Sequence, residues 1–180
     1  QVNRYPADAV DDLEFGPEGR FFVAAGAQTV LLWRVETLDL LRARPICDRE
    51  SVTIEAVDFS ADGAVIAVAC SDGVVEMQRV VDGKRVRRLE ECEARAWDVA
   101  IGPRGMRLAA ACDRGAVVWD RPTGEVATRL QTSDTTVTSV AFGAGGGRLA
   151  VGTDAGGVEL WDVNEAARIR PYGSGDPRVE

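Results

Sequence analysis

Polar residues follow the first apolar residue of four similar segments, and they include carboxylates in three of the segments and one tryptophan. The segments are residues 10–15, 54–59, 96–101 and 137–142, each with apolar residues at its first, fourth and sixth positions. Carboxylates beside an aromatic ring can bind a cationic side chain through charge, burial and cation–π contact. If these positions lie together, they predict a partner-binding site, with a basic peptide as candidate ligand. Its candidate residues are Trp97, Asp98, Asp11, Asp12, Glu55, Thr138 and Ser139.

A simpler interpretation of the same residues stays open. Trp97 packs against a neighbouring loop in that interpretation, and the acids are ordinary solvated strand ends. Three further carboxylates, Asp72, Asp113 and Asp154, each stand near a turn. Side chains of this kind usually accept hydrogen bonds from local backbone N–H groups, so we expect that role for them.

The residue types needed for common catalytic and cofactor sites do not come together in this sequence. The chain has no His, which excludes Ser-His-Asp and Cys-His arrangements and an imidazole base. The run Gly145–Gly147 lies between predicted strands and does not open a helix, so it is not a phosphate-binding loop. No stretch has the oxygen density of a Ca²⁺ site. We expect no catalysis, no cofactor and no metal.

The elements that would position the candidate site repeat along the chain. The last residues of the four segments, Phe15, Phe59, Ile101 and Phe142, recur at intervals of 41 to 44 residues. A Gly-containing turn follows each segment, and three more short strands follow that turn in each repeat. Four short antiparallel strands at this period predict an all-β propeller with no long helix. The expected fourth strands are residues 38–42, 85–89, 125–130 and 167–170.

Composition and charge restrict the classes of partner. The net charge is −8, which argues against a nucleic-acid surface, and the longest apolar run, residues 64–70, has seven residues, too few for a membrane span. Only one of the 21 basic residues is a lysine, a bias that hints at a GC-rich bacterial gene. The four cysteines form no Cys-x-x-Cys pair, so we expect reduced thiols and a cytoplasmic setting.

Several motifs make the chain similar to the WD-repeat (WD40) family over residues 5–171. They are Trp119-Asp120 and Trp161-Asp162 at strand ends, Phe59-Ser-Ala-Asp-Gly63, Ser71-Asp-Gly73 and Arg121-Pro-Thr-Gly124. The resemblance implies four propeller blades, at approximately 5–44, 50–90, 93–131 and 134–171, with a tail at 172–180. It also implies binding of protein partners by the face that carries the loops between blades. The family's Gly-His pair is absent, so its hydrogen-bond network through His cannot form, and blade packing must rest mainly on apolar burial.

Four blades make about half of a seven- or eight-bladed ring, which leaves two blade faces to be covered. Flanking blades of a longer chain, a second copy forming an eight-bladed ring, or a closed four-bladed ring would each solve this. Gln1 in place of Met favours the longer chain. The functional hypothesis is a non-catalytic protein-interaction scaffold within a larger multidomain protein. The alternatives are the propeller body of an enzyme whose catalytic domain lies elsewhere, and a self-assembly segment.

Overall fold

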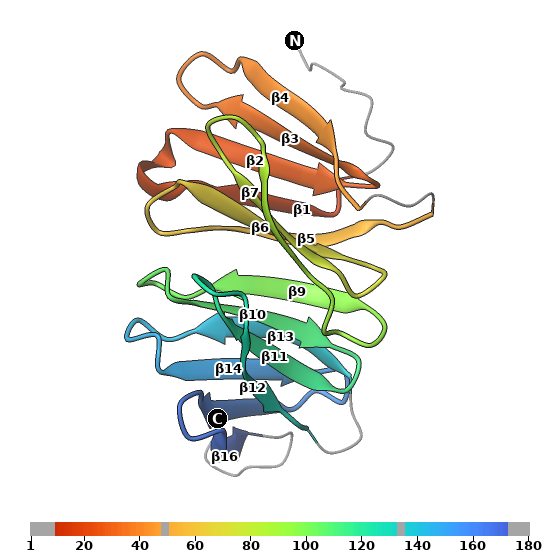
Figure 1. The fold of residues 1–180 in the computed structure, drawn as a ribbon, viewed down its shortest axis with the longest axis vertical. Helices are drawn as coiled ribbons and strands as arrows, with labels where there is room; N and C mark the ends of the chain where they lie inside the picture. Colours follow the sequence, from red (N-terminus) through yellow and green to blue (C-terminus); the bar gives the residue numbers. More distant parts are fainter. Residues whose placement is uncertain (1–9, 48–50, 133–135, 173–180) are drawn as a thin grey trace.

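The computed structural model describes residues 10–47, 51–132 and 136–172 and consists of four antiparallel sheets of four strands each (Figure 1). Strand order in space follows strand order in sequence within every sheet. Blade 1 contains β1 (Asp12–Phe15), β2 (Phe21–Gly26), β3 (Thr29–Arg34) and β4 (Leu40–Pro45). Blade 2 contains β5 (Ile54–Phe59), β6 (Val65–Cys70), β7 (Val75–Arg79) and β8 (Arg85–Leu89). Blade 3 contains β9 (Ala96–Ile101), β10 (Arg107–Cys112), β11 (Gly115–Asp120) and β12 (Val126–Leu130). Blade 4 contains β13 (Val137–Phe142), β14 (Arg148–Thr153), β15 (Val158–Asp162) and β16 (Ala167–Tyr172).

The predicted turns shape these sheets. Gly63 and Gly105 both have φ +66°, the left-handed conformation that favours glycine, and each donates its N–H to the carbonyl three residues earlier at 2.7 Å. The helical content among the described residues is one 3₁₀ turn, Pro17–Gly19, and no helix there is long and apolar enough to cross a membrane. One strand prediction was wrong: β4 begins at Leu40, because Leu38 has φ +56° and belongs to the preceding turn.

The blades stack face to face, and an apolar cluster fills each of the three junctions. Val57 and Phe59 of blade 2 pack on Val23 and Leu32 of blade 1, and Trp119 of blade 3 packs in the cluster shared with blade 2. Blade 1, in red and orange, and blade 4, in blue, lie at opposite ends of the long axis (Figure 1). The stack is therefore an open propeller segment, and the closed four-bladed ring left open by the sequence is not what the structure shows.

The four cysteines form two disulfides, so the expectation of reduced thiols was wrong. Cys47 pairs with Cys70, and Cys92 pairs with Cys112. In each pair, the first cysteine lies in the connection that leaves one blade, and the second ends the second strand of the next blade. The paired cysteines are 23 and 20 residues apart in sequence, so the sequence alone did not indicate that the blade geometry brings them together. The predicted cytoplasmic setting loses the support of the reduced thiols and stays a prediction.

Candidate functional site

The first strands of the four blades, β1, β5, β9 and β13, lie side by side, and aspartates tie each to the next. A carboxylate on one strand accepts a hydrogen bond from a backbone N–H of the following blade's first strand. Charge-assisted bonds of this kind fix the spacing of neighbouring strands. The bonds run from Val57 N–H to Asp12 (2.8 Å), from Ile101 N–H to Asp58 (2.5 Å) and from Val140 N–H to Asp98 (2.9 Å).

These strands enclose an acidic hollow of about 420 Å³. Asp12, Glu14, Asp58 and Asp98 all line it, together with apolar side chains that include Phe142. No Lys or Arg occurs among the described residues of the lining. The hollow therefore presents four carboxylates without a basic side chain beside them.

Burial and mutual repulsion make this charge costly. The pKa of Asp58 is raised to about 6, mainly by burial and also by the charges of Glu14 and Asp98, against the lowering effect of the N–H groups of Ile101 and Phe59. Burial likewise raises the pKa of Asp98, and the charge of Asp12 raises it by a smaller amount. The backbone N–H groups of Val140 and Val99, which donate to Asp98, lower the pKa in part. The pKa of Glu14 rises for the same two reasons, burial and the charge of Asp12. A cation in the hollow would relieve these repulsions.

The rim of the site is formed where β5, β9 and β13 each carry a β-bulge at their first residues. The bulged residues are Glu55, Trp97 and Thr138. Arg95 covers the Trp97 ring, with its guanidinium carbon 4.5 Å from a ring centroid, and also pairs with Glu55 at 3.6 Å. The indole N–H of Trp97 donates to Asp113 at 2.6 Å. A bulge redirects a side chain away from the regular pleat, which separates these residues from the hollow.

The predicted site residues therefore fall into two groups. Asp12 and Asp98 line the hollow, whereas the other predicted residues do not line it. Asp11 accepts a hydrogen bond from the N–H of Ala27 (3.2 Å), and Glu55 accepts one from the hydroxyl of Thr53 (2.9 Å). The exposed Thr138 hydroxyl faces the carbonyl of Gly152 at 3.5 Å. Ser139 is exposed and lies close to Gly152. A Cβ added to Gly152 would lie 2.3 Å from the hydroxyl oxygen of Ser139.

Sequence reasoning missed Glu14 and Asp58. Each stands at the fifth position of its segment, directly before the last apolar residue, and Glu14 lies two residues after the predicted Asp12. Because side chains alternate along a strand, residues two apart share a face, and this period was the available signal. Of the turn carboxylates, Asp72 has the expected local role, accepting the N–H of Val74 at 3.3 Å.

The comparisons with known proteins agree with this architecture. Residues 124–162 match the family model described as WD domain, G-beta repeat. An uncharacterized WD repeat-containing protein of Synechocystis sp. is 28% identical over 122 residues, which cover 66% of this chain and 34% of that protein. The chain thus spans about a third of that relative's length.

Solved structures share the fold at low sequence identity. A chain of Kuenenia stuttgartiensis hydrazine synthase superposes with a TM-score of 0.82 at 15% identity, covering 95% of this chain and 51% of that one. A chain of the mitotic checkpoint complex gives 0.82 at 19% identity, covering 91% of this chain and 49% of that one. The chain thus contains a segment that matches a WD repeat, and its four four-stranded blades have the fold of a β-propeller.

Proposed function

We propose that this chain is a non-catalytic protein-interaction scaffold that binds a basic segment of a protein partner in the acidic hollow. The observation that carries the proposal is the set of four carboxylates in one concave lining without a basic side chain. The raised pKa values of Asp58, Asp98 and Glu14 show that this charge is held at a cost. An Arg or Lys side chain would offset that cost by pairing with the carboxylates.

The hollow and its rim suit a short peptide. Its volume of about 420 Å³ accommodates one or two long side chains. Phe142, which is partly exposed in the lining, would contact the aliphatic stem of Arg or Lys while the carboxylates bind the charged end. At the rim, Trp97 already stacks with Arg95 of the same chain, so the aromatic face is occupied until Arg95 moves.

The half-ring also supports a place in a larger assembly. The chain covers about half of each propeller chain compared above and about a third of the WD-repeat relative. We therefore propose that its blades form part of a larger multidomain protein or ring. None of the residues described here favours the alternative of a propeller that serves as the body of an enzyme.

Fluorescence anisotropy with a labelled Gly/Arg peptide tests the binding proposal, with a citrulline peptide of the same length as the uncharged control. Glu14→Gln and Asp58→Asn remove charge from the hollow, and the Asn amide oxygen can still accept the N–H of Ile101. Glu125→Gln is the matched control, because Glu125 is an exposed carboxylate outside the hollow.

Each hollow variant should weaken the Arg peptide about tenfold at low salt, while the Glu125→Gln chain should bind like the wild type. Arg95→Ala should strengthen binding if Trp97 joins the site once uncovered, and Trp97→Ala should then cancel that gain. Equal binding of the two peptides, or an equal loss in Glu125→Gln, would refute a site in the hollow.

A further inference from the structure

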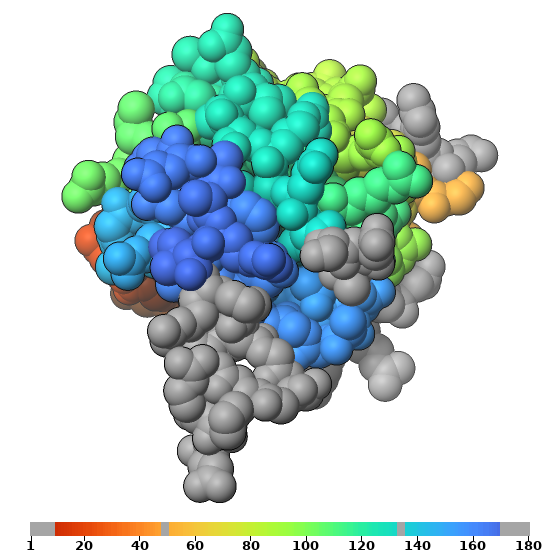
Figure 2. All heavy atoms as spheres, turned by 90° about the horizontal axis from the view of Figure 1, so that it is seen from below, coloured from red at the N-terminus to blue at the C-terminus, as the bar shows by residue number. Residues whose placement is uncertain are grey.

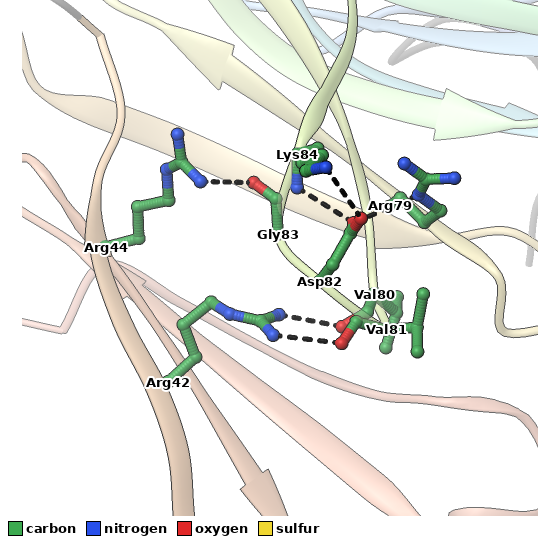
Figure 3. Close-up of polar contacts among 8 residues, drawn as sticks. All are labelled: Arg42, Arg44, Arg79, Val80, Val81, Asp82, Gly83 and Lys84. Atoms are coloured by element: carbon green, nitrogen blue, oxygen red, sulfur yellow. Dashed lines mark hydrogen bonds and ion pairs between the residues drawn. The ribbon is translucent and has the colours of Figure 1, made fainter.

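An arginine on the outer strand of one blade reaches across each of the first two junctions to the next blade. Arg42 of β4 donates to the carbonyls of Val80 (2.7 Å) and Val81 (3.1 Å), which lie in the β7–β8 turn of blade 2 (Figure 3). Arg87 of β8 donates to two carbonyls of the β11–β12 turn of blade 3, those of Pro122 and Thr123, both at 2.8 Å. Both arginines have the same position in their blades: Arg42 pairs with Leu32 and Arg87 with Met77, each the third-strand residue directly before a β-bulge. We call this contact the arginine latch.

The receiving turn is built to present its carbonyls. In blade 2, Asp82 accepts hydrogen bonds from the side chain of Arg79 (3.0 Å) and the N–H of Lys84 (3.1 Å), which fixes the turn (Figure 3). Arg44 adds a third bond to the same turn, at the carbonyl of Gly83 (2.7 Å). The guanidinium groups therefore meet an ordered set of acceptors.

At both latches the arginine lies against a glycine four residues after the third strand of the receiving blade, Gly83 at φ +67° and Gly124 at φ +79°. A Cβ on Gly83 would lie 2.8 Å from Cδ of Arg42, and one on Gly124 would lie 2.6 Å from Cδ of Arg87. At the third junction both partners are replaced: Thr128 takes the arginine's register position, opposite Val118, and Ala166 takes the glycine's place. Arginine and glycine thus occur together at the first two junctions and are both absent at the third.

The outer strand of blade 4 restores the arginine. Arg170, in the last of the four described blades, stands opposite Leu160, the register position of Arg42 and Arg87. The sheet face on that side is open, since Val158 is 46% exposed whereas its equivalents in the other blades are at most 4% exposed. Figure 2 looks onto this end of the stack, with blade 4, in dark blue, in front of the other blades.

Blade 1 of a second copy does not fit the latch rule. Its turn has the same path, because the N–H of Leu38 donates to the carbonyl of Arg34 just as that of Gly83 donates to Arg79. The glycine position, however, is held by Leu38, which is 67% exposed. Its side chain would occupy the space that the arginine takes at the internal junctions.

We propose that the open face of blade 4 docks a further WD-type blade whose third-to-fourth-strand turn carries glycine at this position, with Arg170 as its latch. The occupant is such a glycine-bearing blade and not blade 1 of a second copy of this chain. Continuity with the internal junctions supports the face, and the arginine–glycine pairing supports the choice of partner.

The test uses the wild-type chain as the arginine donor and a variant of the same chain as the acceptor. The acceptor probe is Leu38→Gly/Arg170→Thr, whose blade 1 has the required turn and which lacks its own latch. Labelled wild-type chain is titrated with this probe by sedimentation velocity, and Arg170→Thr alone serves as the matched control probe. Thr is chosen because blade 3 carries Thr128 at the same register position, and circular dichroism checks that each variant is folded.

The wild-type chain should bind the double variant at least tenfold more tightly than the control probe, as expected for hydrogen bonds from a charged group. Labelled Arg170→Thr should lose this gain. Equal affinity for the two probes would overturn the glycine rule. Self-association of the wild type as tight as its binding to the double variant would show that a second copy is the occupant. The peptide experiment on the hollow uses another surface, so either proposal can fail alone.

Discussion

Removing the two disulfides should lower the stability of the chain by an amount set by the loops they close. Cys47–Cys70 spans 23 residues and Cys92–Cys112 spans 20. Closing a loop of that length restricts the unfolded chain and contributes about 3 kcal/mol at 25 °C in the chain-entropy account. For a domain of this size, that loss lowers Tm by roughly 6–12 °C for each disulfide.

The measurement is thermal unfolding followed by circular dichroism, with and without reductant. Cys47→Ala/Cys70→Ala and Cys92→Ala/Cys112→Ala remove the disulfides singly, and the quadruple variant removes both. The two sites lie at different junctions, so their effects should add. Reductant should lower Tm of the wild type toward that of the quadruple variant and leave the quadruple variant unchanged.

A thiol titration of the unfolded, oxidised chain completes the experiment. It should find no free thiol, because all four cysteines are paired. Four titratable thiols in chain kept under air, together with a Tm that reductant does not change, would refute the disulfides. Loss of stability in only one double variant would restrict the reasoning to that junction.

Two further predictions follow from the hollow and from one turn. The raised pKa of Asp58, about 6 against 3.8, means that the folded chain binds this proton more tightly than the unfolded chain. Stability should therefore rise as pH falls from 7 toward 5, by about 1–2 kcal/mol from this group, and Asp58→Asn should reduce that rise in urea unfolding. Gly73→Ala should cost about 3 kcal/mol because its Cβ would lie 2.3 Å from the carbonyl oxygen of Ala94 at φ +84°. Gly156→Ala, at φ +79° with open space around it, should cost only about 1 kcal/mol, and equal losses would contradict this steric account.

The fold could be predicted because its signals are local and repeated. Apolar alternation, turn glycines and a period near 42 residues each specify the same four-stranded unit, and four copies in register exclude most other folds. Strand ends were less predictable. Leu38 was assigned to a strand on its apolar character, but its left-handed conformation is set by the turn that Arg34 closes.

The candidate site was predicted only in part because the chosen positions straddle the β-bulges. A bulge adds one residue to the strand, so Trp97 and Asp98 turn to different surroundings although they are neighbours in sequence. The latch was invisible for another reason. Its acceptors are backbone carbonyls about 40 residues away, and their only trace in sequence is the glycine that makes room for the arginine.

The three junctions between blades differ in the contacts that stabilise them, and the junction with the fewest kinds of contact is the third. Each has an aspartate bond between first strands and an apolar cluster, and the first two add a disulfide and an arginine latch. The third has neither, because Thr153 takes the cysteine position, opposite Val137, and Thr128 takes the arginine position. Blade 4 is therefore joined to the other blades mainly by apolar burial and by Asp98. Since blade 4 also carries Arg170 and the open sheet face, the least cross-linked blade is the one placed to adjust to an incoming neighbour.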